Sequence, residues 1–85
     1  MEKEHKIHLT IASGSGDYED DFNQNMQIHA VKTKAMAHLH IDPSQAGNYV
    51  LTFGGNILDE NKTLLELRIP DNSVLILEPK EADKI

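Results

Sequence analysis

Hydrophobic and polar positions alternate near the start of the chain. Ile7, Leu9 and Ile11 occupy every second position, with polar residues between them. A period of two is typical of a strand that buries one of its faces. We therefore predict a first strand over residues 6–12.

A turn and a less regular strand follow. Residues 13–17 contain two glycines, which adopt backbone angles that other residues reach only at a cost. Residues 18–23 contain the apolar Tyr18 and Phe22, but the three acidic residues between them are poor strand formers. This composition predicts an edge strand held by its neighbour.

The hydrophobic period changes to three or four over residues 26–40. The apolar residues at this spacing are Ile28, Val31, Ala35 and Leu39. They share one face of an amphipathic helix. We expect Asn25 to cap the start of this helix and Asp42-Pro43 to end it.

Short strands and turns fill the second half of the chain. After a loop over residues 44–48, residues 49–53 and 56–58 form two strands joined by Gly54-Gly55. Thr63 and Glu66 have the spacing of a capping box and predict one helical turn. A turn that contains Pro70 leads into a last strand over residues 74–78.

This order of elements predicts an α+β fold, with a mixed sheet of four to five strands over one helix. We expect the first and last strands to pair, with the last strand between the first and the third. We expect residues 1–85 to form one domain, with an ordered core over about residues 6–79 and mobile tails.

Composition narrows the function. The net charge of −6 disfavours nucleic acid and anionic membranes as partners. The absence of cysteine excludes disulfides and thiol chemistry on this chain. No apolar run approaches the roughly 20 residues that span a bilayer, and the first residues do not resemble a signal peptide. We expect a cytoplasmic protein.

Candidate chemistry is sparse. His38 and His40 lie two residues apart, so on a helix they point away from each other and cannot share a metal ion. Residues 13–16, SGSG, lack the Gly-Lys-Ser/Thr of a phosphate-binding loop, and acidic residues follow them. That acidic run either protects an edge strand or docks a basic partner. No arrangement of nucleophile and base is evident, so we expect no enzyme, no metal and no cofactor.

A family resemblance sharpens the expected fold. Residues 51–64, LTFGGNILDENKTL, resemble the third-strand hairpin of ubiquitin and its relatives, and residues 69–77, IPDNSVLIL, are similar to the family's final turn and strand. Ile28, Val31, Lys32 and the step Ile41-Asp42-Pro43 extend the match over about residues 7–78. The resemblance implies the ubiquitin-like β-grasp fold, and the composition is closer to bacterial ubiquitin-like proteins than to eukaryotic ubiquitin.

The resemblance fails at the positions through which ubiquitin acts. Conjugated relatives end in Gly-Gly, whereas this sequence closes with EADKI. Thr52, Ile76 and Glu78 stand where the family has the isoleucine, histidine and valine of its receptor-binding patch. We therefore expect no conjugation and no binding of the usual receptors.

Strand alternation still predicts an apolar surface on the outer side of the sheet. Val50, Thr52, Val74 and Ile76 are expected there, together with His8. Such a cluster often marks a protein interface, although β-branched residues are also common in strands for their propensity alone. The expected function is a monomeric, non-conjugated ubiquitin-like module that binds proteins as an adaptor or regulator. The alternatives are a modifier or sulfur carrier with a tail made by processing or fusion, and a small metal- or ligand-binding domain.

Overall fold

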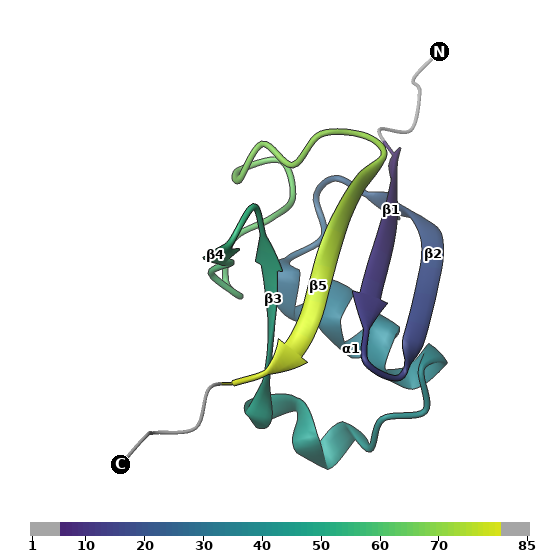
Figure 1. The fold of residues 1–85 in the computed structure, drawn as a ribbon. Coiled ribbons are helices and arrows are strands. Elements are labelled where there is room, and N and C mark those ends of the chain that lie inside the picture. Colours follow the sequence, from purple (N-terminus) through teal and green to yellow (C-terminus); the bar gives the residue numbers. More distant parts are fainter. Residues whose placement is uncertain (1–5, 81–85) are drawn as a thin grey trace.

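The computed structural model describes residues 6–80. Its elements are β1 (Lys6–Ser13), β2 (Gly16–Asn23), α1 (Ile28–His38), the 3-10 helix η1 (Pro43–Asn48), β3 (Tyr49–Phe53), β4 (Asn56–Ile57) and β5 (Ser73–Pro79). Figure 1 shows α1 behind the sheet and η1 beyond one end of it. The predicted α+β class is confirmed. The predicted tails fall mainly on residues 1–5 and 81–85, which lie outside the described residues.

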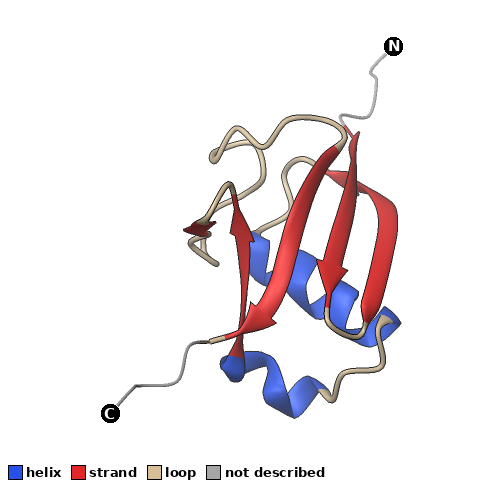
Figure 2. Cartoon of the chain, in the orientation of Figure 1, coloured by secondary structure: helices blue, strands red, loops and turns tan. Residues whose placement is uncertain are grey.

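The five strands form one mixed sheet in the order β2-β1-β5-β3-β4. β1 and β5 are parallel, while the other neighbouring pairs are antiparallel. β5 therefore lies between β1 and β3, as the sequence predicts (Figure 2). Gly54 and Gly55 both have positive φ, at 60° and 86°, which is the backbone twist that a two-residue hairpin requires.

The core lies between the sheet and α1. Alternate residues of β1, β3 and β5 point toward the helix, and one apolar face of the helix packs against them. The buried hydrophobic residues of this cluster are Leu9, Ile11, Phe22, Ile28, Val31, Ala35, Met36, Leu51, Leu58, Leu64, Ile69, Leu75 and Leu77. The other face of the sheet carries no helix and is called the outer face below (Figure 1).

Both ends of α1 differ from the prediction over residues 26–40. Gln27, not Asn25, precedes the first turn, and its side chain makes no capping hydrogen bond. The Asn25 N–H instead donates to the side chain of Asn23 in a turn that follows β2. At the other end His40 has a φ of 62°. The N–H groups of His40 and Ile41 donate to Ala37 and Met36, so a left-handed residue ends the helix before Asp42-Pro43 is reached.

Asp42 and Pro43 begin η1 rather than ending α1. The Asp42 side chain accepts a hydrogen bond from the Ser44 N–H at 2.9 Å, and Pro43 occupies the first turn. This hydrogen bond lowers the pKa of Asp42. Residues 44–48, which the sequence predicts as a loop, are therefore helical. The expected capping box is confirmed: Thr63 and Glu66 exchange side-chain to backbone hydrogen bonds at 2.9 and 3.0 Å.

Lys32 connects α1 to three other segments of the chain. Its side chain is only 3% exposed, and its Nζ donates to the carbonyls of Ala46 and Tyr49 and to Glu60 Oε2 at 2.7, 3.0 and 2.6 Å. A buried ammonium needs such partners because its desolvation is otherwise costly. Lys32 thus joins α1, η1, the start of β3 and the loop after β4.

Candidate functional site

The outer face carries exposed hydrophobic side chains along one half of the sheet. Val74 and Ile76 on β5 are 53% and 46% exposed, and Ile57 on β4 is 68% exposed. The predicted outward orientation of Val74 and Ile76 is confirmed. Single exposed apolar residues are ordinary, but several on neighbouring strands of one face form a surface that a partner can cover.

Val50 and Thr52 also point outward, but they are not exposed. Cross-strand pairing places Val50 opposite Glu78 and Thr52 opposite Ile76. Their exposed fractions are only 9% and 6%. The prediction that they form part of an exposed surface is therefore wrong. Thr52 is flanked by Ile76 on one side and, through the β3–β4 pairing, by Ile57 on the other, and these longer side chains shield it from solvent.

The two shielded residues help to line a pocket on the outer face. Its lining residues are Val50, Thr52, Gly55, Ile57, Glu78 and Pro79, and its volume is about 230 Å³. These residues come from β3, β4, β5 and the hairpin turn between β3 and β4. Below, "the pocket" means this set. It is smaller than the roughly 300–1,000 Å³ of sites that hold cofactors or drug-sized ligands.

Glu78 supplies the one charged side chain of the pocket lining. The Thr52 hydroxyl donates to Glu78 Oε2 at 3.3 Å, a long and therefore weak hydrogen bond. Within residues 6–80 no basic side chain forms an ion pair with Glu78. The pocket thus combines apolar walls with a carboxylate that has most of its hydrogen-bonding capacity left.

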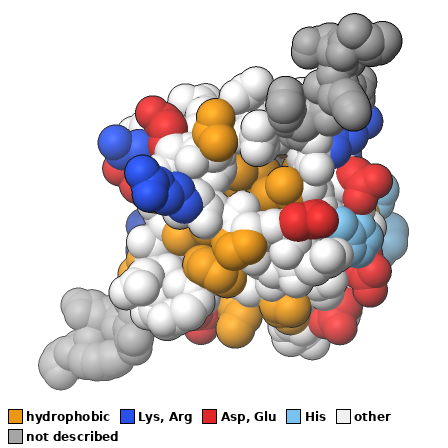
Figure 3. Space-filling view, turned by 90° about the horizontal axis from the view of Figure 1, so that it is seen from above, with side chains coloured by type: hydrophobic (Ala, Val, Ile, Leu, Met, Phe, Trp, Pro, Cys, Tyr) orange, Lys and Arg blue, Asp and Glu red, His pale blue; other side chains and the backbone are white. Residues whose placement is uncertain are grey.

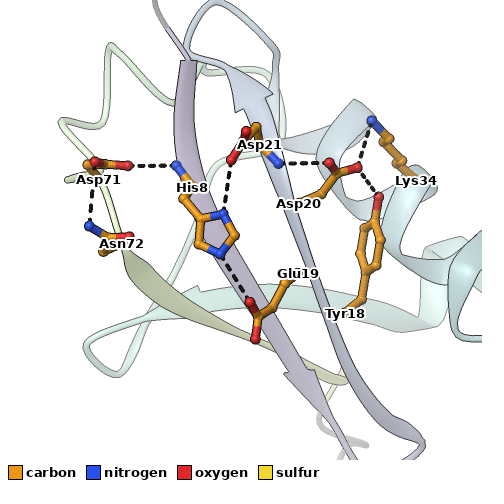
Figure 4. Close-up of polar contacts among 8 residues, drawn as sticks. All are labelled: His8, Tyr18, Glu19, Asp20, Asp21, Lys34, Asp71 and Asn72. Carbon is orange, nitrogen blue, oxygen red and sulfur yellow. Dashed lines mark hydrogen bonds and ion pairs between the residues drawn. The ribbon is translucent and has the colours of Figure 1, made fainter.

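The β1–β2 half of the outer face has a different character. His8 Nδ1 lies 2.9 Å from Asp21 Oδ1, and His8 Nε2 lies 3.1 Å from Glu19 Oε1 (Figure 4). The backbone N–H of His8 also donates to Asp71 at 2.7 Å. Below, "the His8 cluster" means His8, Glu19 and Asp21. Hydrogen bonds that the ring donates to Asp21 and, to a smaller extent, to Glu19 raise the pKa of His8, because both carboxylates favour the protonated ring.

A second polar group lies on the other side of β2, toward α1. Asp20 accepts hydrogen bonds from the Tyr18 hydroxyl and the Asp21 N–H, and Lys34 Nζ lies 3.2 Å from it (Figure 4). The Tyr18 hydrogen bond is the main reason that the pKa of Asp20 falls to about 2. Burial and the same carboxylate raise the pKa of Tyr18. The Tyr18 ring stacks on His38, with ring centroids 4.2 Å apart.

The acidic run at residues 19–21 is therefore divided between two surfaces. Glu19 and Asp21 bind His8 on the outer face, while Asp20 binds Tyr18 and Lys34 on the side of the helix. Figure 3 shows histidine beside acidic side chains at one edge of the molecule, with hydrophobic side chains nearer the centre of the view. Most of the acidic charge on β2 thus has a partner within the domain.

The structure brings together most, but not all, of the residues predicted from the sequence. Val50, Thr52 and Ile76 are neighbours, and Val74 lies two residues from Ile76 along β5. His8 lies apart, because Ala12 is the β1 residue opposite Ile76, about 13 Å farther along the strand. Ile57 was missed, although a two-residue turn at Gly54-Gly55 already implies that Ile57 pairs with Thr52.

Other candidate sites find little support among the described residues. Within residues 6–80 no group of three or more histidine and acidic side chains has the geometry to hold a metal ion. His29 lies 3.8 Å from Glu60, and His38 stacks on Tyr18. In the same range, no helix has the length and apolar character needed to cross a membrane.

Comparison with known proteins supports the fold. A search of curated proteins finds no match. Among solved structures, a ubiquitin of Caldiarchaeum subterraneum has a TM-score of 0.75 at 23% identity, covering 93% of this chain and 99% of its own. The N-terminal ubiquitin-like domain of the 4931431F19Rik protein has a TM-score of 0.76 at 20% identity, over 98% and 83% of the two chains.

A third structure, described as "Molecular Mimicry of SUMO promotes DNA repair", has a TM-score of 0.80 at 17% identity, over 89% and 94% of the two chains. At these identities the likeness establishes the fold, which is the predicted ubiquitin-like β-grasp. A family model described as "Protein of Unknown function (DUF2604)" matches residues 2–81. The chain therefore belongs to the DUF2604 family and has a ubiquitin-like fold.

Proposed function

We propose that this chain is a ubiquitin-like protein-interaction module, an adaptor or regulator that works without being conjugated. The observation that carries the proposal is the outer face around β3, β4 and β5. There Ile57, Val74 and Ile76 are about half exposed or more, beside a pocket whose carboxylate, Glu78, forms no ion pair within residues 6–80. Ubiquitin-like folds suit this role because one sheet face is free of the helix.

The pocket and the exposed side chains serve different purposes in this proposal. Ile76 and Val74 supply apolar area. Its removal from water by a partner contributes a favourable hydrophobic free energy of about 25 cal/mol per Å². Val50 and Thr52 contribute as the buried floor of the pocket. His8 lies at the edge of the contact area because of its distance along β1, and both of its ring nitrogens already contact carboxylates.

Replacing Ile76 by aspartate tests the proposal. Ile76→Asp places a charge in the centre of the apolar surface, and we expect loss of proteins captured from a lysate of the native organism and identified by mass spectrometry. Leu65→Asp is the matched control, since Leu65 is 52% exposed but lies in the turn after Thr63 rather than on the sheet. Both variants should keep the wild-type circular dichroism spectrum. Equal capture by wild type and Ile76→Asp would refute the proposed surface.

The alternative function is a modifier or sulfur carrier, which acts through an activated C-terminal carboxylate. Residues 81–85 lie outside the described residues. Incubation with the activating enzyme of the native organism and ATP should give no adenylate or thioester on this chain. Formation of either product would establish the alternative. In this role the chain is a cytoplasmic monomer that uses no catalytic residue, cofactor or metal.

A further inference from the structure

The pocket has a composition that selects its occupant. Val50, Ile57 and Pro79 give it an apolar lining, while Glu78 gives it a negative charge. We infer that the pocket receives a lysine or arginine side chain of a protein partner, with the aliphatic stem against the walls and the cationic head at Glu78. This inference rests on the proposed function and specifies the chemistry of its partner.

Size agrees with a single long side chain. A water molecule occupies about 30 Å³ of the liquid, so the five non-hydrogen atoms of a lysine side chain fill on the order of 150 Å³. The pocket volume of about 230 Å³ accommodates that side chain and remains too small for a typical cofactor. Lysine and arginine commonly lay their stems along apolar surface while the charged end meets a polar group.

Glu78 differs from the acidic groups of the domain that already have a cationic partner. Glu19 and Asp21 bind His8, Asp20 binds Lys34, and Glu60 binds Lys32. By contrast, among residues 6–80 the carboxylate of Glu78 receives one weak hydrogen bond from Thr52 and no ion pair. The net charge of −6 further favours a basic segment of a partner.

The neighbouring surface specifies what flanks the basic side chain. Ile76 lies directly beside Thr52 across the β3–β5 pair, and Val74 follows two residues away on the same face. A partner segment that places a basic side chain in the pocket therefore lies with its adjacent residues over Ile76. Apolar residues beside the lysine or arginine complete the contact.

Short peptides test this inference on the full chain. The probes are capped tripeptides, acetyl-Leu-X-Leu-amide, with lysine, arginine, norleucine or glutamate as X. Norleucine keeps the aliphatic stem and lacks the charge. We expect the lysine and arginine peptides to shift the NMR signals of Val50, Thr52 and Ile57 and to bind about two- to fivefold more tightly than the norleucine peptide. This preference should shrink as salt is added.

Two variants locate the source of the preference. Glu78→Gln keeps the shape of the side chain and should equalise the lysine and norleucine peptides. Asp17→Asn removes the same charge from β2 on the same face, outside the pocket lining, and should leave the preference unchanged. Both variants alter exposed side chains and should retain the wild-type spectrum.

The inference would be overturned by no binding of the lysine peptide, by equal binding of the lysine and norleucine peptides by wild type, or by a preference that survives in Glu78→Gln. Shifts confined to residues 17–21 would also overturn it. These results would refute the inference about the pocket without refuting the proposed function. Ile76→Asp tests whether the outer face captures proteins at all, whereas the peptides test what enters the pocket.

Discussion

The two halves of the outer face use their charges in opposite ways. On β1 and β2 the carboxylates of Glu19 and Asp21 hold the ring of His8, so the polar groups satisfy one another. On β3 and β5 Glu78 has no cationic partner among residues 6–80, and exposed Ile57 and Ile76 lie beside it. Groups that are already satisfied gain little from a partner protein, whereas unpaired charge and uncovered apolar area gain most.

The largest expected effect is a difference in stability between variants on the inner and outer sides of β5. Leu75→Ala removes a fully buried side chain and should lower the free energy of unfolding by about 2–5 kcal/mol. Ile76→Ala removes a side chain that is 46% exposed and should cost less than about 1 kcal/mol. Urea denaturation of both variants measures the difference. A cost for Ile76→Ala equal to that for Leu75→Ala would show that Ile76 belongs to the core rather than to a binding surface.

The next effect concerns Asp20 and its partners Tyr18 and Lys34, on the helix side of β2. The Tyr18 hydroxyl, the Asp21 N–H and Lys34 hold the pKa of Asp20 at about 2. Because the pKa is lowered by folding, this contribution to stability is complete above the unfolded pKa near 3.8 and is lost as pH falls toward 2. Tyr18→Phe should raise the pKa of Asp20, as carboxyl NMR titration will show. An unchanged Asp20 pKa would contradict the assigned hydrogen bond.

A smaller effect is expected at the His8 cluster. The pKa of His8 is raised above 6.5 by Asp21 and Glu19, so its contribution to stability is complete below the unfolded pKa of 6.5. It is lost as pH rises through the folded pKa. NMR titration should show the His8 pKa falling in Asp21→Asn, while Glu78→Gln leaves it unchanged. A His8 pKa that does not respond to Asp21→Asn would break the contrast between the two halves.

Periodicity and turn residues were sufficient to predict most of the fold. Alternation predicted β1, strand-forming runs next to turn residues predicted β3 and β5, and the change of period predicted α1. The ends of α1 were missed because they depend on specific hydrogen bonds. One is the Asn23 side chain that binds the Asn25 N–H, and the other is the left-handed backbone at His40.

The candidate site was predicted less completely, for a physical reason. Alternation shows which way Val50 and Thr52 point, but exposure also depends on the neighbours on adjacent strands. The register of the β3–β4 hairpin brings Ile57 beside Thr52, and β5 brings Glu78 beside Val50. Whether Glu78 or Asp21 finds a cationic partner depends on tertiary placement, which no local pattern contains.

The most direct measurement maps a bound partner on the domain itself. A protein captured by wild type and lost in Ile76→Asp is titrated into the isotope-labelled chain, and NMR signals are followed residue by residue. The account predicts the largest changes at Val50, Thr52, Ile57 and Ile76, with small changes at Glu19 and Asp21. Changes concentrated on Glu19, Asp20 and Asp21, with Val50 and Ile76 undisturbed, would contradict it.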